Sequence, residues 1–258
     1  MSEPEKVPEQ LQSSINFRVF IIILGLVIGF QFYINSIPDP EEADYIISVI
    51  SILNPLAASI TAFYVAKKYR DSKVFGRAYF ALGLGLSMFA LGEISYGALD
   101  LLGAETYPSI ADVFFFLFYP LGLYHLITNI RFFKPKLGIT TKAIVVIIPV
   151  SIIAIYSYLS FNAIGEANFD YYYGLIFIIA SSLVLSAGIL GARIFRQGIL
   201  GVAWLVLVIG IVLTTTGDVW YYYLETFDQY DLTHPVNLFW YASYMVITYA
   251  LYKHQNLI

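Results

Sequence analysis

Runs of mostly apolar residues, each about 20 residues long or longer, occur eight times along the chain, and short polar segments separate them. A helix that crosses the hydrocarbon core of a bilayer needs about 20 such residues in succession. The pattern therefore predicts eight transmembrane helices and no extra-membrane domain large enough to fold alone. The predicted spans are residues 18–36, 45–66, 75–102, 109–130, 140–161, 170–195, 199–224 and 234–253.

The composition indicates that lipid is the solvent of this chain. Of the 258 residues, 59% are hydrophobic and 12% are charged. Soluble domains carry about 25% charged residues, so this chain has too few to cover a water-exposed surface. It has no cysteine, which excludes disulfides, thiolate metal sites and cysteine nucleophiles. The acidic, proline-containing residues 1–17 are predicted to form a disordered cytoplasmic tail.

The basic residues indicate how the predicted helices are oriented. Every Lys and Arg falls before or at the start of an odd-numbered span, or at the end of or after an even-numbered span, so all 14 lie at one face of the membrane. Cytoplasmic loops are enriched in Lys and Arg. We therefore predict a multi-pass protein of the plasma membrane with both termini in the cytoplasm. The basic residues are Lys6, Arg18, Lys67, Lys68, Arg70, Lys73, Arg77, Arg131, Lys134, Lys136, Lys142, Arg193, Arg196 and Lys253.

The second half of the chain is similar to the first half at an offset of 125 residues. Glu93 aligns with Asp218, each preceded by glycine, and Asp100 aligns with Glu225. Apolar runs match one another by chance, whereas paired glycines and acids seldom do. The predicted fold is therefore all-α, a tandem duplication of a four-helix unit, with both units in the same orientation and related by a pseudo-twofold axis along the membrane normal. The predicted units are residues 18–136 and 137–258.

Glycines fall on one face of the third span and recur in the seventh. Gly85 and Gly92 are seven residues apart, and Gly210 and Gly217 repeat the spacing. Small residues along one face let membrane helices approach closely. We interpret these glycines as packing positions and expect spans three and seven to be central.

Acidic residues lie inside the third and seventh spans, where an ionisable side chain is costly and is a functional candidate by default. Glu93 and Asp100 are two helical turns apart on one face, with Tyr96 between them. From the rise per residue, Glu93 should lie about 10–15 Å below the outer surface. The seventh span carries the same arrangement as Asp218, Tyr221 and Glu225.

The fourth and eighth spans add polar residues at a matching depth. Asp112 lies about one turn into span four, where an acid meets the positive end of a helix, and Asn237 is its counterpart. We expect Glu93, Asp112, Asp218 and Asn237 to face one cavity open to the outside, with tyrosines on its wall. The predicted ligand-binding residues are Glu93, Tyr96, Asp100, Asp112, Asp218, Tyr221, Glu225, His234 and Asn237.

Three roles for these acids stay open at this point. In the first, each acid is protonated or hydrogen-bonded to tyrosine, to residues 214–216 or to backbone, and it stabilises the bundle. In the second, the acids bind a cation or an amine. The third is catalysis by a metal-dependent intramembrane hydrolase. A zinc site would need several histidines, and only His234 lies near the acids, whereas an all-carboxylate Mg²⁺ or Ca²⁺ site stays open in principle. No pairing of nucleophile and base, no phosphate-binding loop and no nucleic-acid-binding surface is found, so we predict no catalytic residue and leave the cofactor and metal undetermined.

Part of the first repeat resembles a known kind of membrane region. The resemblance rests on Gly92-Glu93, on the segment YPSIADVFF that begins at Tyr107, and on Tyr119-Pro120. These residues are similar to the multi-span sensor regions that precede bacterial diguanylate cyclases and histidine kinases. The resemblance covers about 35 residues and implies a sensory or ligand-binding membrane module. No output domain follows Lys253, so a signal would have to pass to a separate partner protein in the membrane or the cytoplasm.

These observations lead to one functional prediction and two alternatives. We expect a non-enzymatic membrane protein with an outward-facing acidic and aromatic cavity, acting as a sensor or as an accessory subunit of a membrane complex in the lipid bilayer. The first alternative is a small transporter or channel for a cation or amine. The almost wholly apolar segments 78–88 and 203–213 argue against a continuous polar path along these two helices. The second alternative is the intramembrane hydrolase.

Overall fold

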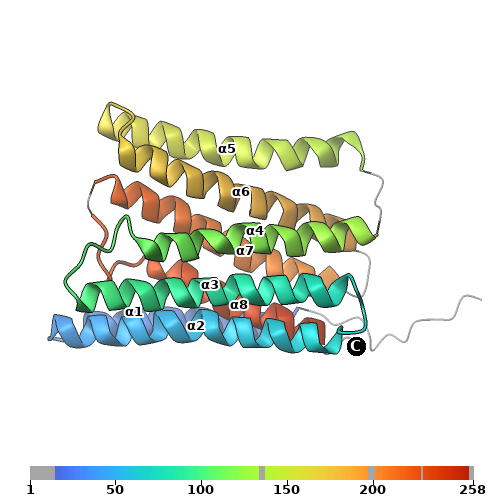
Figure 1. Ribbon diagram of the computed structural model, residues 1–258, viewed down its shortest axis with the longest axis horizontal. Helices are drawn as coiled ribbons and strands as arrows, with labels where there is room; N and C mark the ends of the chain where they lie inside the picture. Colours follow the sequence, from blue (N-terminus) through green and yellow to red (C-terminus); the bar gives the residue numbers. More distant parts are fainter. Residues whose placement is uncertain (1–14, 134–136, 197–200, 228, 256–258) are drawn as a thin grey trace, which may run out of the picture.

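The computed structural model describes residues 15–133, 137–196, 201–227 and 229–255, and this part of the chain contains helices and no strand. Consecutive helices run antiparallel along one long axis (Figure 1). The predicted disordered tail falls largely outside the described residues. The helices are α1 (Phe17–Asn35), α2 (Pro40–Lys68), α3 (Phe75–Leu101), α4 (Ile110–Phe132), α5 (Ile139–Ile164), α6 (Phe169–Phe195), α7 (Gly201–Glu225) and α8 (Asn237–Gln255).

Helices α1 to α7 are each long and apolar enough to cross a membrane, and this seven-helix set comes from the described residues. The chain is therefore a multi-pass, membrane-type helical protein. Helix α8 has 19 residues but lies outside this set. Polar residues at its two ends, together with four tyrosines and one tryptophan, lower its hydropathy, which is why composition alone does not mark it as a span.

Two helices begin elsewhere than the apolar pattern predicts, and local chemistry explains both. Helix α2 begins at Pro40 rather than near residue 45, because the Asp39 side chain accepts a hydrogen bond from the Glu41 backbone N–H and proline suits the first helical position. Helix α8 begins at Asn237, three residues after the predicted start. His234 and Pro235 form a turn in front of it, where the His234 ring accepts a hydrogen bond from a backbone N–H.

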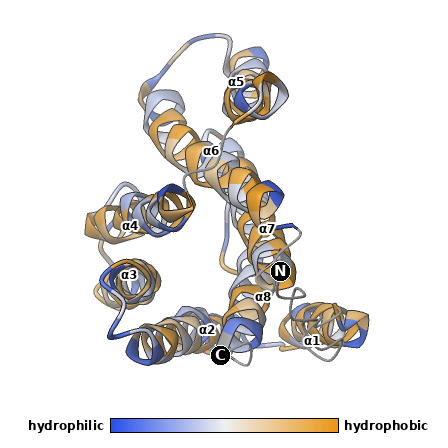
Figure 2. Cartoon of the chain, turned by 90° about the vertical axis from the view of Figure 1, so that its right-hand side faces the viewer, coloured by the Kyte–Doolittle hydropathy of each residue, from blue (hydrophilic) through white to orange (hydrophobic). Residues whose placement is uncertain are grey.

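Six of the helices form a closed ring, seen end-on in Figure 2. Each packs against two others, in the order α2, α3, α4, α6, α7, α8 and back to α2. Helix α1 lies outside the ring against α8 and α2, and α5 lies outside it against α6 and α7. Helices α3 and α7 are thus on opposite sides of the ring and are not neighbours.

The glycine faces of α3 and α7 each pack against the following helix. A Cβ atom at Gly92 would overlap the Phe115 ring of α4, and one at Gly217 would lie 2.8 Å from the Trp240 indole of α8. A side chain at either position would force the neighbouring ring to shift. The expectation that these glycines are packing positions agrees with these contacts, and the partners are α4 and α8.

The two ends of the bundle differ in charge. Lys68 ends α2, and the last turns of α4, α6 and α8 contain Arg131, Arg193 and Lys253. Because the helices alternate in direction, these residues lie at one end of the bundle, called here the basic end (Figure 1). The opposite end contains the acidic loops and the C-terminal part of α3.

Candidate functional site

An internal cavity of about 70 Å³ lies within the ring, toward the end opposite the basic end. Ten of the fifteen side chains around it are aromatic, two are carboxylates, and none is Lys or Arg. They come from α2, α3, α4, α7, α8 and the connection between α7 and α8. The lining residues are Ser51, Phe89, Glu93, Tyr96, Phe115, Tyr119, Asp218, Tyr221, Tyr222, Tyr230, Leu232, Asn237, Trp240, Tyr241 and Tyr244.

Helical spacing explains why these side chains meet. Residues three, four and seven apart lie on one face of a helix. Helix α8 contributes Asn237, Trp240, Tyr241 and Tyr244, which follow this spacing and form a single stripe along the cavity. Helices α3, α4 and α7 contribute shorter stripes of the same spacing, so the cavity is where four such faces converge.

Glu93 presents a carboxyl group to this cavity without a protein partner. Within the described part of the chain no hydrogen bond or ion pair joins its side chain to another group, and the salt bridge found there pairs Arg70 with Asp71 at the basic end. The rings of Phe89 and Tyr96 stand one turn to either side of it on α3. Glu93 is thus an acidic group in an aromatic cavity, and none of the groups around it donates a hydrogen bond to it or supplies a counter-charge.

Asp218, its counterpart in the sequence repeat, is in the opposite situation. This buried carboxylate accepts hydrogen bonds from the Ser181 hydroxyl at 2.6 Å, from the Tyr119 hydroxyl at 3.1 Å and from the Trp240 indole N–H at 3.1 Å. The donors come from α6, α4 and α8, so Asp218 ties three helices to α7. A carboxylate with three donors is stabilised in place. The structural role considered for the acids therefore describes Asp218 well.

The connection between α7 and α8 covers the cavity at the end opposite the basic end. Its Tyr230 donates a hydrogen bond of 3.1 Å to Asn237 Oδ1, and the Asn237 amide donates one of 2.7 Å to the Leu232 carbonyl. Burial, followed by the nearby Tyr96 and Glu93, raises the pKa of the Tyr230 hydroxyl well above its usual range. Tyr230 therefore stays a neutral group near Glu93, and both ends of the Asn237 amide are occupied.

Asp112 does not line the cavity. Its Oδ2 accepts a hydrogen bond of 2.7 Å from the Ser109 backbone N–H, while the Ser109 hydroxyl accepts one of 3.2 Å from the Ala111 N–H. This reciprocal pair is a capping box at the start of α4. The carboxylate thus caps its own helix, and it also interacts with the Tyr173 hydroxyl of α6.

The remaining predicted site residues also lie away from the cavity lining. Asp100 is exposed near the end of α3, and Glu225 ends α7. His234 is half-buried, and its ring lies edge-on to Trp220, with 5.4 Å between the ring centroids. Of the nine predicted residues, the structure brings five together around the cavity, and ligand binding by them stays a prediction. These five are Glu93, Tyr96, Asp218, Tyr221 and Asn237.

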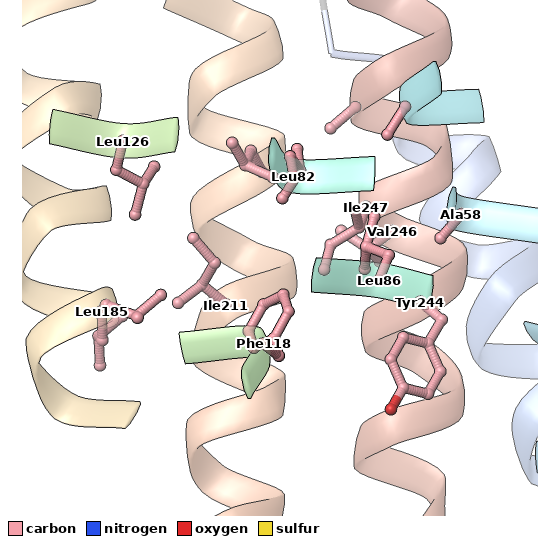
Figure 3. Packing of buried hydrophobic residues seen from close by; sticks show 14 of the residues in the cluster. Ala58, Leu82, Leu86, Phe118, Leu126, Leu185, Ile211, Tyr244, Val246 and Ile247 are labelled. Carbon is pink, nitrogen blue, oxygen red and sulfur yellow. The ribbon is translucent and has the colours of Figure 1, made fainter. Parts of the chain in front are cut away.

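The cavity has an apolar floor toward the basic end. Leu86 of α3 and Ile247 of α8 are buried there, beside Phe118 of α4 and Ile211 of α7, as Figure 3 shows. The Phe118 ring also stacks on Phe89, a cavity-lining residue, with centroids 4.2 Å apart. Side chains from four helices thus close the centre of the ring below the cavity.

Comparisons with known proteins do not identify this chain. No protein-family model, no curated protein and no solved structure matches it. The described residues also contain no group of three or more His, Cys, Asp or Glu side chains placed to hold a metal ion. The function must therefore be argued from the cavity itself.

Several cavity residues were not among the predicted site residues, although a signal for most of them exists in the sequence. Tyr119 and Tyr244 are aligned by the repeat, and Trp240 and Tyr241 follow Asn237 at helical spacing. These residues can be predicted if the aromatic residues on the same helix face as each polar residue are included in the site. Ser181 gives no such signal, because its counterpart at the repeat offset is Leu56.

Proposed function

We propose that this protein binds a small positively charged ligand in the cavity around Glu93, and that it acts as a sensor or as a ligand-binding subunit of a membrane complex. The observation that carries the proposal is the Glu93 carboxyl group, which faces the cavity with no partner from the described chain. An ionised carboxylate in such surroundings is costly unless an opposite charge or a proton balances it. A bound cation supplies that charge.

The membrane arrangement of the proposal has eight crossings, both termini in the cytoplasm and a location in the plasma membrane. Helix α8 is as long as α1 and packs along α7 and α2 within the ring. If it crosses, the described Lys and Arg residues near helix ends all face the cytoplasm, as the distribution of basic residues in membrane proteins requires. With α8 lying on the surface instead, the ring would be broken on one side.

We also propose that the ring arose by duplication of a four-helix unit. The order of neighbours in the ring is unchanged when α2 is exchanged with α6, α3 with α7 and α4 with α8. For example, the contact between α2 and α8 becomes the contact between α6 and α4. The close approaches of Gly92 to Phe115 and of Gly217 to Trp240 are also related by the sequence offset. The outer helices depart from this symmetry, because α1 packs on α8 whereas α5 packs on α6.

A sensor or binding subunit fits the cavity better than a channel does. A transport path needs polar groups or water along its whole length, whereas a layer of buried apolar side chains that includes Leu86 and Ile247 crosses the ring below the cavity (Figure 3). The resemblance of residues 92–120 to multi-span sensor regions favours the same function. A separate partner protein would receive the signal.

Thermal unfolding of the purified protein in detergent tests this function. A ligand that binds only the folded state raises the unfolding temperature, by the equivalent of about 2.7 kcal/mol at 100 times its Kd. We expect at least one cation in a panel of monovalent, divalent and organic cations to stabilise the wild type and not Glu93→Gln. Glu105→Gln, a change to an exposed loop carboxylate, is the matched control and should keep the effect. If no cation stabilises the wild type, the proposed function is wrong.

A further inference from the structure

Apart from Glu93, the carboxylate and amide groups of the cavity are engaged with protein donors and acceptors, which limits what a ligand meets there. Asp218 already accepts three hydrogen bonds, and Asn237 uses both ends of its amide. Tyr241 and Ser51 pair through their hydroxyls at 3.0 Å. Glu93 is left as the carboxylate with open acceptor positions, so a ligand would meet a single negative group.

The polar groups of this cavity do not suit a divalent metal ion. Ca²⁺ takes six to eight oxygen ligands, and Mg²⁺ needs an almost ideal octahedron of oxygens. One open carboxylate provides at most two oxygens. The absence of any three-residue metal-binding group among the described residues agrees with this conclusion.

The walls of the cavity suit an organic cation instead. A positive nitrogen within about 6 Å of an aromatic ring is attracted to the face of that ring, and tryptophan and tyrosine attract it most strongly. The Tyr221 ring lies edge-on to both Tyr230 and Trp240, with centroids 4.8 Å and 5.5 Å apart. On the other side, Phe89 stands at 5.6 Å from Tyr244. Rings from three helices and from the connection before α8 therefore surround the space beside Glu93.

The volume limits the size of such a cation. Measured as the space open to the centre of a water-sized sphere, one water needs about 10–15 Å³, so a cavity of about 70 Å³ has room for about five groups of that size. Methylammonium and dimethylammonium, with two and three non-hydrogen atoms, are within this limit. Each has an N–H group for the Glu93 carboxylate and at least one methyl group for the rings.

We infer that the ligand is a small alkylammonium ion with at least one N–H, held by the Glu93 carboxylate and by the aromatic rings around it. This inference rests on the proposed function and specifies its ligand. The carboxylate supplies charge and a hydrogen bond, and the rings favour a cation that carries methyl groups over a hydrated inorganic ion. Neutral molecules of the same size lack the charge and should bind less well.

The test uses the full chain in detergent and measures unfolding temperature against ligand concentration at constant ionic strength. The probes are methylammonium, dimethylammonium, potassium, calcium and magnesium chlorides, with tetraethylammonium as an oversized cation. The variants are Glu93→Gln and Phe115→Leu, with Glu105→Gln and Tyr158→Leu as matched changes at exposed positions. Phe115→Leu keeps an apolar side chain against Gly92 and removes a ring from the wall.

The expected result is stabilisation of the wild type by methylammonium or dimethylammonium and no comparable effect of potassium. Glu93→Gln should abolish the shift, and Phe115→Leu should weaken apparent affinity by about 2- to 30-fold. Both exposed variants should bind like the wild type. A Glu93-dependent shift with calcium or magnesium alone would overturn the alkylammonium assignment and keep the proposed function. An alkylammonium shift that survives Glu93→Gln overturns the assignment, and no shift with any cation overturns both.

Discussion

The Tyr119 hydroxyl of α4 donates a hydrogen bond of 3.1 Å to Asp218 Oδ2 of α7, which links the two halves of the chain across the interior of the ring. These helices are not neighbours in the ring, so the bond bridges a space that backbone packing leaves open. The Ser181 and Trp240 donors complete the set around the same carboxylate. Asp218 therefore links four helices in the half of the ring farther from the basic end. The carboxylate oxygens of its counterpart Glu93 face the cavity without a hydrogen-bond donor from the protein.

This difference predicts opposite effects of two similar substitutions. Asp218→Asn should lower the free energy of unfolding by about 1–3 kcal/mol, because the asparagine NH₂ group would face donors and leave one of them unsatisfied. Glu93→Gln should leave the stability unchanged or raise it in the absence of ligand, since it removes a charge without a protein partner. Denaturant unfolding in detergent, followed by circular dichroism, measures both. Equal losses in the two variants would mean that Glu93 is also hydrogen-bonded in the folded protein.

The close helix approaches predict which glycines tolerate a methyl group. Gly217→Ala should lower stability by about 1–3 kcal/mol, because the added Cβ would press on the Trp240 indole, which also bonds Asp218. Gly92→Ala should act similarly through Phe115. The matched control is Gly97→Ala on α3, where no atom lies near the added Cβ. We expect the control to keep or slightly raise the unfolding temperature, because alanine favours a helix.

A result in which the three alanine variants unfold at the same temperature would show that α3 and α7 are held farther from their neighbours than the structure indicates. The same measurement on Gly92→Ala and Gly217→Ala also compares the two halves of the ring. Similar losses are expected, since the two contacts are related by the repeat offset.

The sequence predicts the helices well and their arrangement poorly, for a physical reason. The need for about 20 apolar residues is a local property, so seven apolar helices can be recognised from the chain alone. Which helices become neighbours depends on side chains that meet from distant segments, such as Phe115 and Gly92. Nothing in hydropathy places α4 beside α6 or leaves α1 and α5 outside the ring. The repeat suggested a twofold relation but not the order of the helices.

The candidate site shows the same limit at the level of single residues. Helical spacing and depth correctly place Glu93, Asp218 and Asn237 around one cavity. They do not reveal that Asp112 accepts a hydrogen bond from the Ser109 backbone. A carboxylate that caps a helix and one that lines a cavity can lie at the same distance from the end of a span. They also give no sign of Ser181, whose contact with Asp218 arises only when α6 packs on α7.

A second polar cluster at the basic end yields a further prediction. The buried His254 ring lies between two tyrosines, with the Tyr69 hydroxyl 2.9 Å from Nε2 and the Tyr79 hydroxyl 3.1 Å from Nδ1. These bonds attach the end of α8 to the C-terminal end of α2 and to the first part of α3. A double-mutant cycle with Tyr69→Phe and His254→Phe should give a coupling energy of about 0.5–1.5 kcal/mol.

The control for that cycle is Tyr64→Phe paired with His254→Phe, since the Tyr64 side chain is exposed on α2. Its coupling should be close to zero. Additive effects of Tyr69→Phe and His254→Phe would show that the hydrogen bond contributes nothing to holding α8 in the ring.

The last prediction concerns the side of the membrane on which each loop lies, and the chain suits a direct measurement because it contains no cysteine. Single cysteines at Glu105 and Asp231 should react with a membrane-impermeant thiol reagent in intact cells, since both lie in loops at the end opposite the basic end. A cysteine at Arg70 or at Arg196 should react only after permeabilisation, because basic segments stay in the cytoplasm.

A tag after the last residue decides whether α8 crosses. It should be protected from external protease together with an N-terminal tag if there are eight crossings, and exposed alone if α8 stays on the outer surface. Labelling of Arg70→Cys from outside would reverse the orientation and place the Glu93 cavity toward the cytoplasm.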